Sequence, residues 1–174
     1  MRLFVVIKLS NELKVICCDA ISEIQGICIK GSFTRAENLH LTVVFVGEVP
    51  NPAPVISAVG QISAGKITLE TEELGIFSRS GGDICWLGVK RTNQLDLLYN
   101  EATGLLKTEG LRIENRNYKP HITLGRGVVL PEGFDIKTVK LPKGIMISDR
   151  LSVFESKRVD GILRYTEIFY KQFV

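Results

Sequence analysis

Apolar residues follow two different spacings along the chain, and each spacing predicts one kind of secondary structure. Stretches rich in apolar residues such as Val, Ile and Phe are typical of strands, because β-branched and aromatic side chains fit a pleated surface. Such runs cover residues 3–9, 40–47, 66–77, 84–90, 121–126, 145–157 and 162–173. The polar segments 78–83 and 160–161 lie between neighbouring runs and predict the turns of two hairpins.

In three other segments the apolar residues recur every three or four positions, which is the spacing of a helix with one buried face. We expect these helices after the N-cap residue Ser10 as far as Gly26 or Gly31, from the Pro-rich break at 51–54 to Ile62, and over residues 92–108. Strands and helices do not alternate strictly, so the order predicts an α+β fold with antiparallel-rich sheets and helices outside. No linker divides the chain, and we expect residues 1–174 to form a single domain.

The composition is that of a globular protein, and it leaves the class of ligand open. Of the 174 residues, 45% are apolar and 24% are charged, and the net charge is +3. A mildly basic surface permits a nucleic-acid ligand without requiring one, and an ordinary solvated surface is the alternative. Many basic residues lie in the second half of the chain, among them Lys107, Arg112, Arg116, Lys119, Arg126, Lys157, Arg158 and Arg164.

The cysteines and the lengths of the apolar runs exclude several classes of function. The four cysteines form no C-x-x-C pair, and with only two histidines in the chain neither a metal site nor another cofactor is expected. Cys17 fits the buried face of the first predicted helix, and free thiols suit the reducing cytoplasm, which is the expected location. No apolar stretch approaches the roughly 18 residues that a membrane span needs. Neither a membrane nor an obligate protein partner is therefore expected.

The only two histidines of the chain lie in the same local pattern. His40-Leu-Thr-Val and His121-Ile-Thr-Leu each begin one of the predicted strands. Side chains alternate across a strand, so each histidine shares a face with the threonine two residues later, while the apolar residues face the core. These threonines are Thr42 and Thr123. If the two strands face each other, two imidazoles and two hydroxyls converge on one small volume.

This set of side chains suits the opening of a cyclic phosphodiester. Histidine titrates near pH 6.5, so one ring can be neutral while the other is protonated. The neutral ring then accepts a proton from the attacking water, and the protonated ring donates one to the leaving ribose oxygen. The threonine hydroxyls stabilise charge on the non-bridging oxygens. The alternative is a pair of core histidines beside strand-favouring threonines, which leaves the matched patterns unexplained.

Beyond the two motifs, most of the chain resembles the two-histidine phosphoesterase superfamily. It resembles specifically the RNA 2′,3′-cyclic phosphodiesterase family, which is also described as 2′-5′ RNA ligase-like. The similar segments are Arg2–Ile7, Glu37–Glu48, Leu74–Phe77, Cys85–Val89, Tyr118–Arg126 and Phe154–Ser156, followed by Gly161 and Tyr165. They resemble the opening strand, the first motif, the central hairpin, the second motif and the closing hairpin of that family.

The resemblance implies a bilobal α+β fold with two-fold pseudosymmetry, in which antiparallel sheets line a basic central groove. It also implies metal-independent hydrolysis of RNA 2′,3′-cyclic phosphate ends to 2′-phosphate ends, with reversible 2′-5′ ligation as a side activity. By the same resemblance, His40 is the general acid toward the leaving 3′-oxygen, and His121 is the base that activates water. The implied ligand is RNA with a cyclic phosphate end, tRNA fragments included.

Arg126 matches the arginine that follows the second motif in the family, where it pairs with phosphate. It lies five residues after His121, so a regular strand would place the two side chains on opposite faces. A bulge or a strand end at the flanking Gly125 and Gly127 would turn Arg126 inward. Without one, Arg126 is a charge at the rim of the site.

Other residues near the motifs are candidates for holding the RNA. Arg35, Arg116 and Lys119 are candidate phosphate contacts. Phe33 and Tyr118 are candidates for stacking a base, with packing in the core as the alternative. Two positions depart from the family pattern. Val44 stands where many relatives carry lysine, and Asn117 replaces a common proline.

Two other functions stay open on the sequence alone. The same site would also suit a cyclic phosphate derived from ADP-ribose, which offers the same reacting atoms. A non-catalytic module that binds nucleotides or RNA is the second alternative, although both histidines and both threonines are present.

Overall fold

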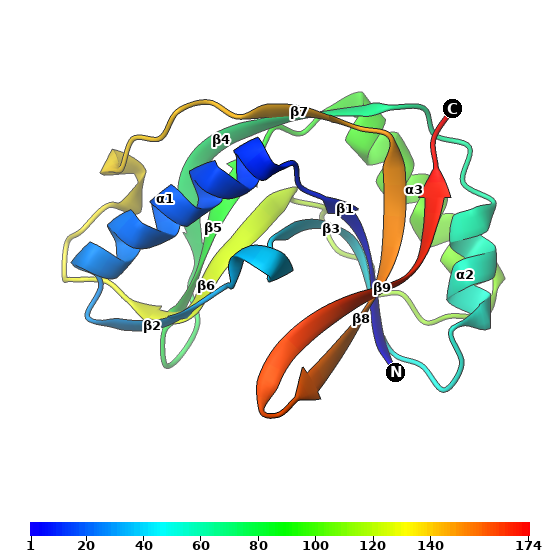
Figure 1. The fold of residues 1–174 in the computed structure, drawn as a ribbon, viewed down its shortest axis with the longest axis horizontal. Helices are drawn as coiled ribbons and strands as arrows, with labels where there is room; N and C mark the ends of the chain where they lie inside the picture. The colour runs from blue at the N-terminus through cyan, green and yellow to red at the C-terminus, as the bar shows by residue number, and fades with distance from the viewer.

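The computed structural model describes residues 1–174 as two antiparallel β-sheets with helices on their outer faces (Figure 1). The strands are β1 (Arg2–Lys8), β2 (Lys30–Phe33), β3 (His40–Glu48), β4 (Ile67–Phe77), β5 (Asp83–Val89), β6 (His121–Val129), β7 (Ile145–Ser148), β8 (Arg150–Val159) and β9 (Ile162–Gln172). The four-stranded sheet has the order β3-β1-β8-β9, and the five-stranded sheet has the order β2-β6-β5-β4-β7. The predicted α+β class with antiparallel sheets is therefore confirmed.

The helices are α1 (Asn11–Ile27), α2 (Ala53–Gly60) and α3 (Asn93–Thr108), and polar side chains cap the first turns of α1 and α3. The Ser10 hydroxyl accepts a hydrogen bond from the Leu13 backbone N–H at 3.2 Å, which confirms the predicted cap. Thr92 caps α3 in the same way through the N–H of Leu95. None of these helices combines the length and the apolar content that crossing a bilayer requires.

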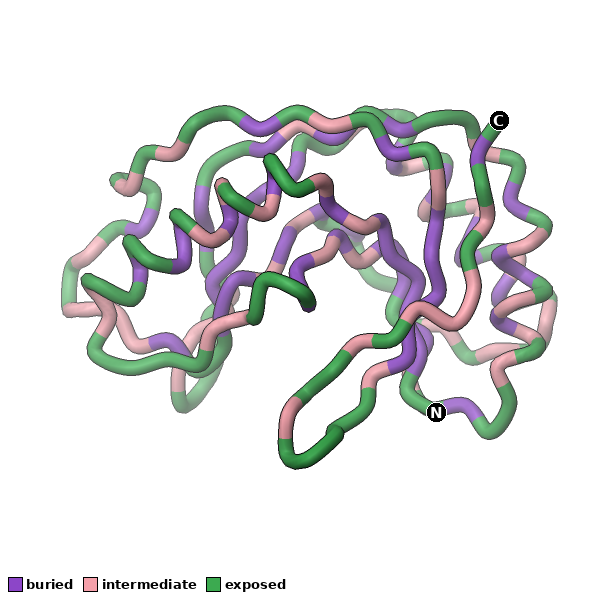
Figure 2. The backbone as a smooth tube through the Cα atoms, viewed as in Figure 1, coloured by how far each residue is buried: buried purple, intermediate pink, exposed green.

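The helices divide between the two sheets. Figure 1 shows α1 lying across the five-stranded sheet, while α2 and α3 lie together beside the four-stranded sheet. Their apolar faces join both sheets in one large core, and buried segments run through the central strands in Figure 2. Cys17 is fully buried in this core, as its place on the predicted helix indicates. The inner faces of the sheets are thus left to polar residues and a few aromatic rings.

The apolar run predicted as one strand over residues 145–157 is two strands in different sheets. β7 pairs with β4, whereas β8 pairs with β1 and β9. The chain changes sheet at Asp149, which lies between β7 and β8. The apolar pattern continues across this change, so only the pairing partners reveal it. The hairpin of β8 and β9 around residues 160–161 is present as predicted.

The short strand β2 is absent from the sequence prediction. It follows α1, which ends at Ile27 rather than at Gly31. β2 is an edge strand, and most of its residues are exposed. An exposed edge strand needs no alternating apolar residues, and its sequence Lys-Gly-Ser-Phe carries no strand signal. β2 nonetheless brings Phe33, one of the predicted candidates for stacking a base, beside β6.

Candidate functional site

Each of the two histidine motifs begins a strand, and the two strands approach each other where the sheets meet. His40 opens β3, opposite Lys8 of β1. His121 opens β6, opposite Gly88 of β5. In both motifs the apolar residues are buried in the core, whereas the histidine and the threonine are only partly buried. The alternation of the strands therefore leaves imidazoles and hydroxyls on the inner faces.

Both imidazoles are oriented by the same backbone contact. Nδ1 of His40 lies 2.7 Å from the carbonyl oxygen of Asn38, and Nδ1 of His121 lies 2.6 Å from that of Lys119. A carbonyl oxygen only accepts, so Nδ1 must donate in each case. The neutral ring then has its lone pair on Nε2, which is free for proton transfer. In His40, Nε2 lies 2.9 Å from Oγ1 of Thr42, which donates to it.

Aromatic rings hold both imidazoles in place. His40 packs against Phe4 and Tyr165, with ring centroids 5.1 and 5.3 Å away. His121 packs edge to face against Phe77, with centroids 5.0 Å apart. These contacts restrict rotation of the rings, so the Nε2 atoms keep a defined direction. Two histidines with similar backbone and aromatic contacts agree with the pseudosymmetry that the family resemblance implies.

Burial lowers the pKa of both histidines, because it disfavours the charged ring. The pKa of His40 falls to about 4, mainly through burial and further through the charges of His121 and Arg126. Burial also lowers the pKa of His121, and Arg126 and Lys119 add to the effect. In the free protein both rings are therefore neutral near pH 7. A bound phosphate anion would counter the arginine charge and favour protonation.

Arg126 reaches the inner face because β6 is irregular beside it. The pairing of β6 with β5 gains one residue between Gly125 and Val128, which is a β-bulge. Gly127 has a φ of 60°, a left-handed conformation that glycine adopts without strain. The bulge that the flanking glycines suggest is therefore present. Arg126 lines a cavity beside the tip of the β8–β9 hairpin rather than an outer rim.

We call this first cavity the His40-side pocket. It has a volume of about 290 Å³ and is lined by residues of β2, β6 and the β8–β9 hairpin. Three arginines and two rings dominate its wall, and no acidic residue lines it: Phe33, Arg35, Arg126, Arg158 and Tyr165. Arg126 and Arg158 have no ion-pair partner, so the pocket attracts anions. Its position is next to Asn38, whose carbonyl orients His40.

A second cavity, the His121-side groove, has a volume of about 500 Å³. It begins at His121 and Thr42, then follows β3 on one side and the loop 112–119 on the other. Tyr118 lies in its wall but is only 8% exposed. Its ring stacks on Tyr99 with centroids 4.6 Å apart. Tyr118 therefore packs in the core, which is the alternative given for it above, and its ring does not present an open face to a base.

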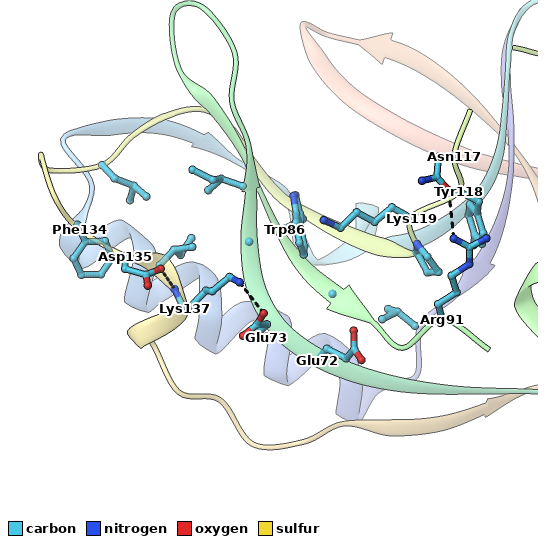
Figure 3. A pocket seen from close by; sticks show the side chains of 17 residues that line it. Glu72, Glu73, Trp86, Arg91, Asn117, Tyr118, Lys119, Phe134, Asp135 and Lys137 are labelled. Atoms are coloured by element: carbon cyan, nitrogen blue, oxygen red, sulfur yellow. Dashed lines mark hydrogen bonds and ion pairs between the residues drawn. The ribbon is translucent and has the colours of Figure 1, made fainter. Parts of the chain in front are cut away.

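A third cavity of about 560 Å³ continues over β4 and β5 (Figure 3). Figure 3 shows Lys119 beside Trp86, and the Lys119 Nζ lies 4.4 Å from the centre of the indole. At the far end Lys137 and Glu73 form an ion pair of 3.0 Å. Asp135 also lines this cavity, so its charge is mixed. It suits a polyanion less well than the other two cavities do.

The structure divides the predicted site residues between the two ends of the histidine pair. Phe33, Arg35 and Arg126 line the His40-side pocket, and Lys119 lines the His121-side groove. Thr123 lies on β6 two residues after His121 and lines neither cavity. No group of three His, Cys, Asp or Glu side chains anywhere in the chain is placed to hold a metal ion.

Five residues around the histidines and the His40-side pocket are not among the predicted site residues: Phe4, Asn38, Phe77, Arg158 and Tyr165. Asn38 carries a local signal, because it precedes its histidine by the same two positions as Lys119 does. The aromatic residues come from other strands and have no such signal. Only the pairing of the strands places them against the imidazoles.

Comparisons with known proteins agree with this site. The sequence profile of the 2′-5′ RNA ligase superfamily matches residues 18–139. The RNA 2′,3′-cyclic phosphodiesterase of Thermotoga maritima is 27% identical over 165 residues, which are 90% of this chain and 87% of that protein. The protein of the same name from Methanocaldococcus jannaschii is 30% identical over 129 residues, covering 72% and 71% of the two chains.

A solved structure shares the whole fold. The crystal structure of Escherichia coli LigT complexed with 3′-AMP superposes with a TM-score of 0.78 at 25% identity, covering 99% of this chain and 96% of that one. A crystal structure described as a phosphoesterase gives a TM-score of 0.79 at 26% identity and covers 99% and 97%. The family resemblance drawn from the motifs is therefore confirmed.

Proposed function

Because the chain belongs to the 2′-5′ RNA ligase superfamily, we propose that it hydrolyses RNA 2′,3′-cyclic phosphate ends to 2′-phosphates, using His40 and His121 as its acid–base pair. One observation carries this proposal. Both imidazoles donate Nδ1–H to the carbonyl two residues upstream and keep Nε2 for chemistry. The relatives named as RNA 2′,3′-cyclic phosphodiesterases support the substrate class. Residues 1–174 act as one domain in this proposal, since the pair draws on both sheets.

The reaction is an in-line displacement at phosphorus. Neutral His121 accepts a proton from water on Nε2, and the water oxygen forms a bond to phosphorus. The bond from phosphorus to the 3′-oxygen breaks, and protonated His40 donates its Nε2 proton to that oxygen. The phosphate stays on the 2′-oxygen. A lowered pKa makes protonated His40 the stronger proton donor, which suits the departure of a ribose oxygen.

The remaining polar groups act on the phosphate itself. The hydroxyl of Thr42 lies within hydrogen-bond distance of His40 Nε2, so it can turn to a non-bridging oxygen when the phosphate arrives. Thr123 has the equivalent place on β6 and the equivalent role. Arg126 is turned to the inner face by the bulge in β6 and forms no ion pair, so its guanidinium is the candidate to pair with the phosphate. Together these groups stabilise the charge of the transition state.

The terminal nucleoside binds in the His40-side pocket. The leaving 3′-oxygen belongs to the terminal ribose, so this ribose must lie on the side of the general acid. Phe33 and Tyr165 are half-buried there and offer ring surface to a base. Arg35 and Arg158 are exposed at the same pocket, where the next phosphate toward the 5′ end would pass.

The decisive experiment incubates the protein in EDTA with a short RNA that ends in a 2′,3′-cyclic phosphate. We expect a product with its phosphate on the 2′-oxygen, identified by mass spectrometry against 2′ and 3′ standards. His40→Ala and His121→Ala should each lose turnover by a factor of at least about 100 while keeping the wild-type circular dichroism spectrum. Wild-type turnover in either folded variant would reject the pair. RNA that binds but is never opened would favour a binding module instead.

A further inference from the structure

The side chain of Asn38 presents an unused hydrogen-bond acceptor to the His40-side pocket. Its amide nitrogen is committed, because Nδ2 donates to the carbonyl oxygen of Leu163 at 3.0 Å. That oxygen only accepts, so the amide cannot turn over, and Oδ1 keeps one direction. Oδ1 receives no hydrogen bond from the chain, yet it is not sealed in the interior as the unpaired Nε1 of Trp86 is. Of the cavities described above, Asn38 lines only this pocket, so Oδ1 is open to a ligand there.

Asn38 is held rigidly, and a rigid acceptor discriminates between ligands. The residue is only 5% exposed. Its backbone N–H donates to the carbonyl oxygen of Arg35 at 2.9 Å, and its own carbonyl oxygen accepts from His40. With the amide bond to Leu163, three hydrogen bonds therefore fix this residue. A buried acceptor that is left without a donor costs free energy, so a ligand that brings no donor to Oδ1 is disfavoured.

The less exposed polar side chains of the pocket wall accept hydrogen bonds from a ligand rather than donate them. The half-buried hydroxyl of Thr34 gives its hydrogen to the carbonyl oxygen of Thr123 at 2.9 Å, so toward a ligand it only accepts. The three arginines of the pocket are donors, but they are exposed and are assigned above to phosphates. The inner part of the pocket therefore favours a ligand edge that carries donors.

Two rings of the same pocket supply a platform for a base. Phe33 lies over Gly125 of β6, where an added Cβ atom would come within 2.9 Å of the ring. Tyr165 packs against His40, with ring centroids 5.3 Å apart. Both rings are half-buried and line the pocket. Stacking on such rings holds any of the four bases, so the choice among bases is left to hydrogen bonds at the base edge.

The four bases differ in the group that they would bring to Oδ1. Adenine and cytosine carry an amino group at the position where guanine and uracil carry a carbonyl oxygen. We propose that Asn38 selects the terminal nucleoside of the RNA, because its Oδ1 accepts a hydrogen bond from the 6-amino group of adenine or the 4-amino group of cytosine. Opposite guanine or uracil, Oδ1 faces a second acceptor and stays unpaired. This inference rests on the proposed function, which places the terminal nucleoside in the His40-side pocket.

The test is a competition between RNAs that differ only in the terminal base. Two cyclic-ended RNAs are mixed with the protein, and the ratio of their 2′-phosphate products gives the ratio of their kcat/KM values. We expect adenine and cytosine ends to be opened about tenfold faster than guanine and uracil ends, the loss typical of one hydrogen bond. A wild-type ratio of one, or a preference that follows ring size and not the amino group, would overturn the proposal.

Asn38→Ala and Asn38→Asp are the matched variants. Both lose the hydrogen bond to Leu163, so any loss of turnover that comes from the hairpin is common to them. Alanine has no acceptor, and we expect its ratio between adenine and uracil ends to fall to within about twofold of one. Aspartate keeps an oxygen in the place of Oδ1, so its ratio should stay at or above that of the wild type. The same ratio in both variants would contradict the role of Oδ1.

Analogues of the terminal base test the same bond in the wild-type protein, independently of how the variants fold. An RNA that ends in purine riboside lacks only the 6-amino group of adenosine, and one that ends in inosine carries a carbonyl oxygen there. Relative to the adenosine end, we expect kcat/KM to fall by about five- to tenfold for purine riboside and at least as much for inosine. Equal opening of the adenosine and purine riboside ends would reject the hydrogen bond.

The outcomes separate the inference from the function on which it rests. Efficient opening of all four RNAs at equal rates would overturn the base selection and leave the proposed hydrolysis intact. Failure to open any of the four would reject the proposed function, and the inference with it.

Discussion

Asn38 connects the β8–β9 hairpin to the imidazole of His40 through two hydrogen bonds. Its buried side-chain amide donates to the carbonyl oxygen of Leu163 at 3.0 Å. Its own backbone carbonyl accepts from Nδ1 of His40 at 2.7 Å. The position of the hairpin therefore influences the direction of the His40 ring. The backbone role of Asn38 has a local signal in its spacing from His40, whereas the role of its amide has none, because the amide acts through a contact with a residue far along the chain.

Asn38→Ala should lower kcat more than it changes KM. Loss of the amide leaves the Leu163 carbonyl unpaired and frees the segment that orients His40, so the unfolding free energy should fall by about 1–3 kcal/mol. We expect kcat to fall by about tenfold and the acidic limb of the pH–rate profile to move, because the environment of the imidazole changes. Asn51→Ala removes a side-chain hydrogen bond to the exposed Ala53 N–H and serves as the control. A fall in stability with an unchanged pH profile would restrict Asn38 to a structural role.

His40 also couples protein stability to pH. Its pKa is lowered from 6.5 to about 4 by burial. The unfolded chain protonates this ring near pH 6.5, and the folded protein protonates it only near pH 4. The contribution of the neutral, buried His40 ring to the unfolding free energy is therefore fully present above pH 6.5 and is lost as the pH falls toward 4. The difference corresponds to up to about 3 kcal/mol.

The variant His40→Gln should lack this part of the acid destabilisation. We expect its unfolding free energy, measured in urea at pH 7.0 and 4.5, to fall by about 2 kcal/mol less than that of the wild type between these values. The wild type and the variant share all other titrating groups, so each curve controls the other. Parallel curves would mean that His40 titrates normally in the folded protein.

At the scale of secondary structure, the hairpin of β4 and β5 shapes the surface beneath His121. Trp86 lies flat over Gly75 of the neighbouring strand, and a Cβ atom at Gly75 would overlap its six-membered ring. The indole in turn lies beneath Lys119, and its centroid is 6.1 Å from that of His121. A glycine in the middle of a strand is thus required by the close approach of a side chain.

Gly75→Ala should displace Trp86 and disturb both stability and activity. Overpacking of this kind costs about 1–3 kcal/mol of unfolding free energy, and kcat/KM should fall because Lys119 and His121 lose their neighbour. Gly104→Ala is the matched control. Gly104 lies within α3 with nothing near an added Cβ, so that change should stabilise the protein by about 0.5–1 kcal/mol. Urea unfolding and the cyclic phosphate assay measure both effects. Equal stability of Gly75→Ala and wild type would refute this account.

At the scale of the whole molecule, positive charge without ion-pair partners surrounds the histidine pair. The unpaired cations that line the two cavities at its ends are Arg79, Arg112, Lys119, Arg126 and Arg158. They belong to both sheets and to separate loops. The net charge of only +3 therefore conceals a local concentration of positive charge. The distribution, and not the total, is what favours RNA.

This distribution predicts a salt dependence for RNA binding. Each phosphate contact on a single strand contributes about 0.7 to the slope of log affinity against log salt. With His40→Ala as the background that prevents turnover, Arg158→Ala should lower this slope for cyclic-ended RNA by about 0.7. Lys14→Ala should leave it unchanged, because Lys14 lies on α1, across the sheet from the site. Fluorescence anisotropy over a range of salt concentrations measures the slope. An equal effect of the two variants would mean that binding is non-local.

Features that depend on neighbouring residues follow from the sequence by itself. The caps at Ser10 and Thr92, the turn at 160–161 and the alternation that places each histidine beside its threonine are all local. The glycines beside Arg126 also predict the bulge that turns it inward. Such features can be predicted from the sequence because a few dihedral angles and nearby hydrogen bonds decide them.

Features that depend on distant residues were decided only by the tertiary structure. The single apolar run 145–157 divides between two sheets because β7 and β8 find different partners. The His40-side pocket combines Phe33 with Tyr165, more than 100 residues later in the chain. No local pattern encodes such a meeting, because it arises from strand pairing and from burial of the shared core. The sequence therefore determined which groups we propose for the chemistry, and the packing of the two sheets determined which residues surround them.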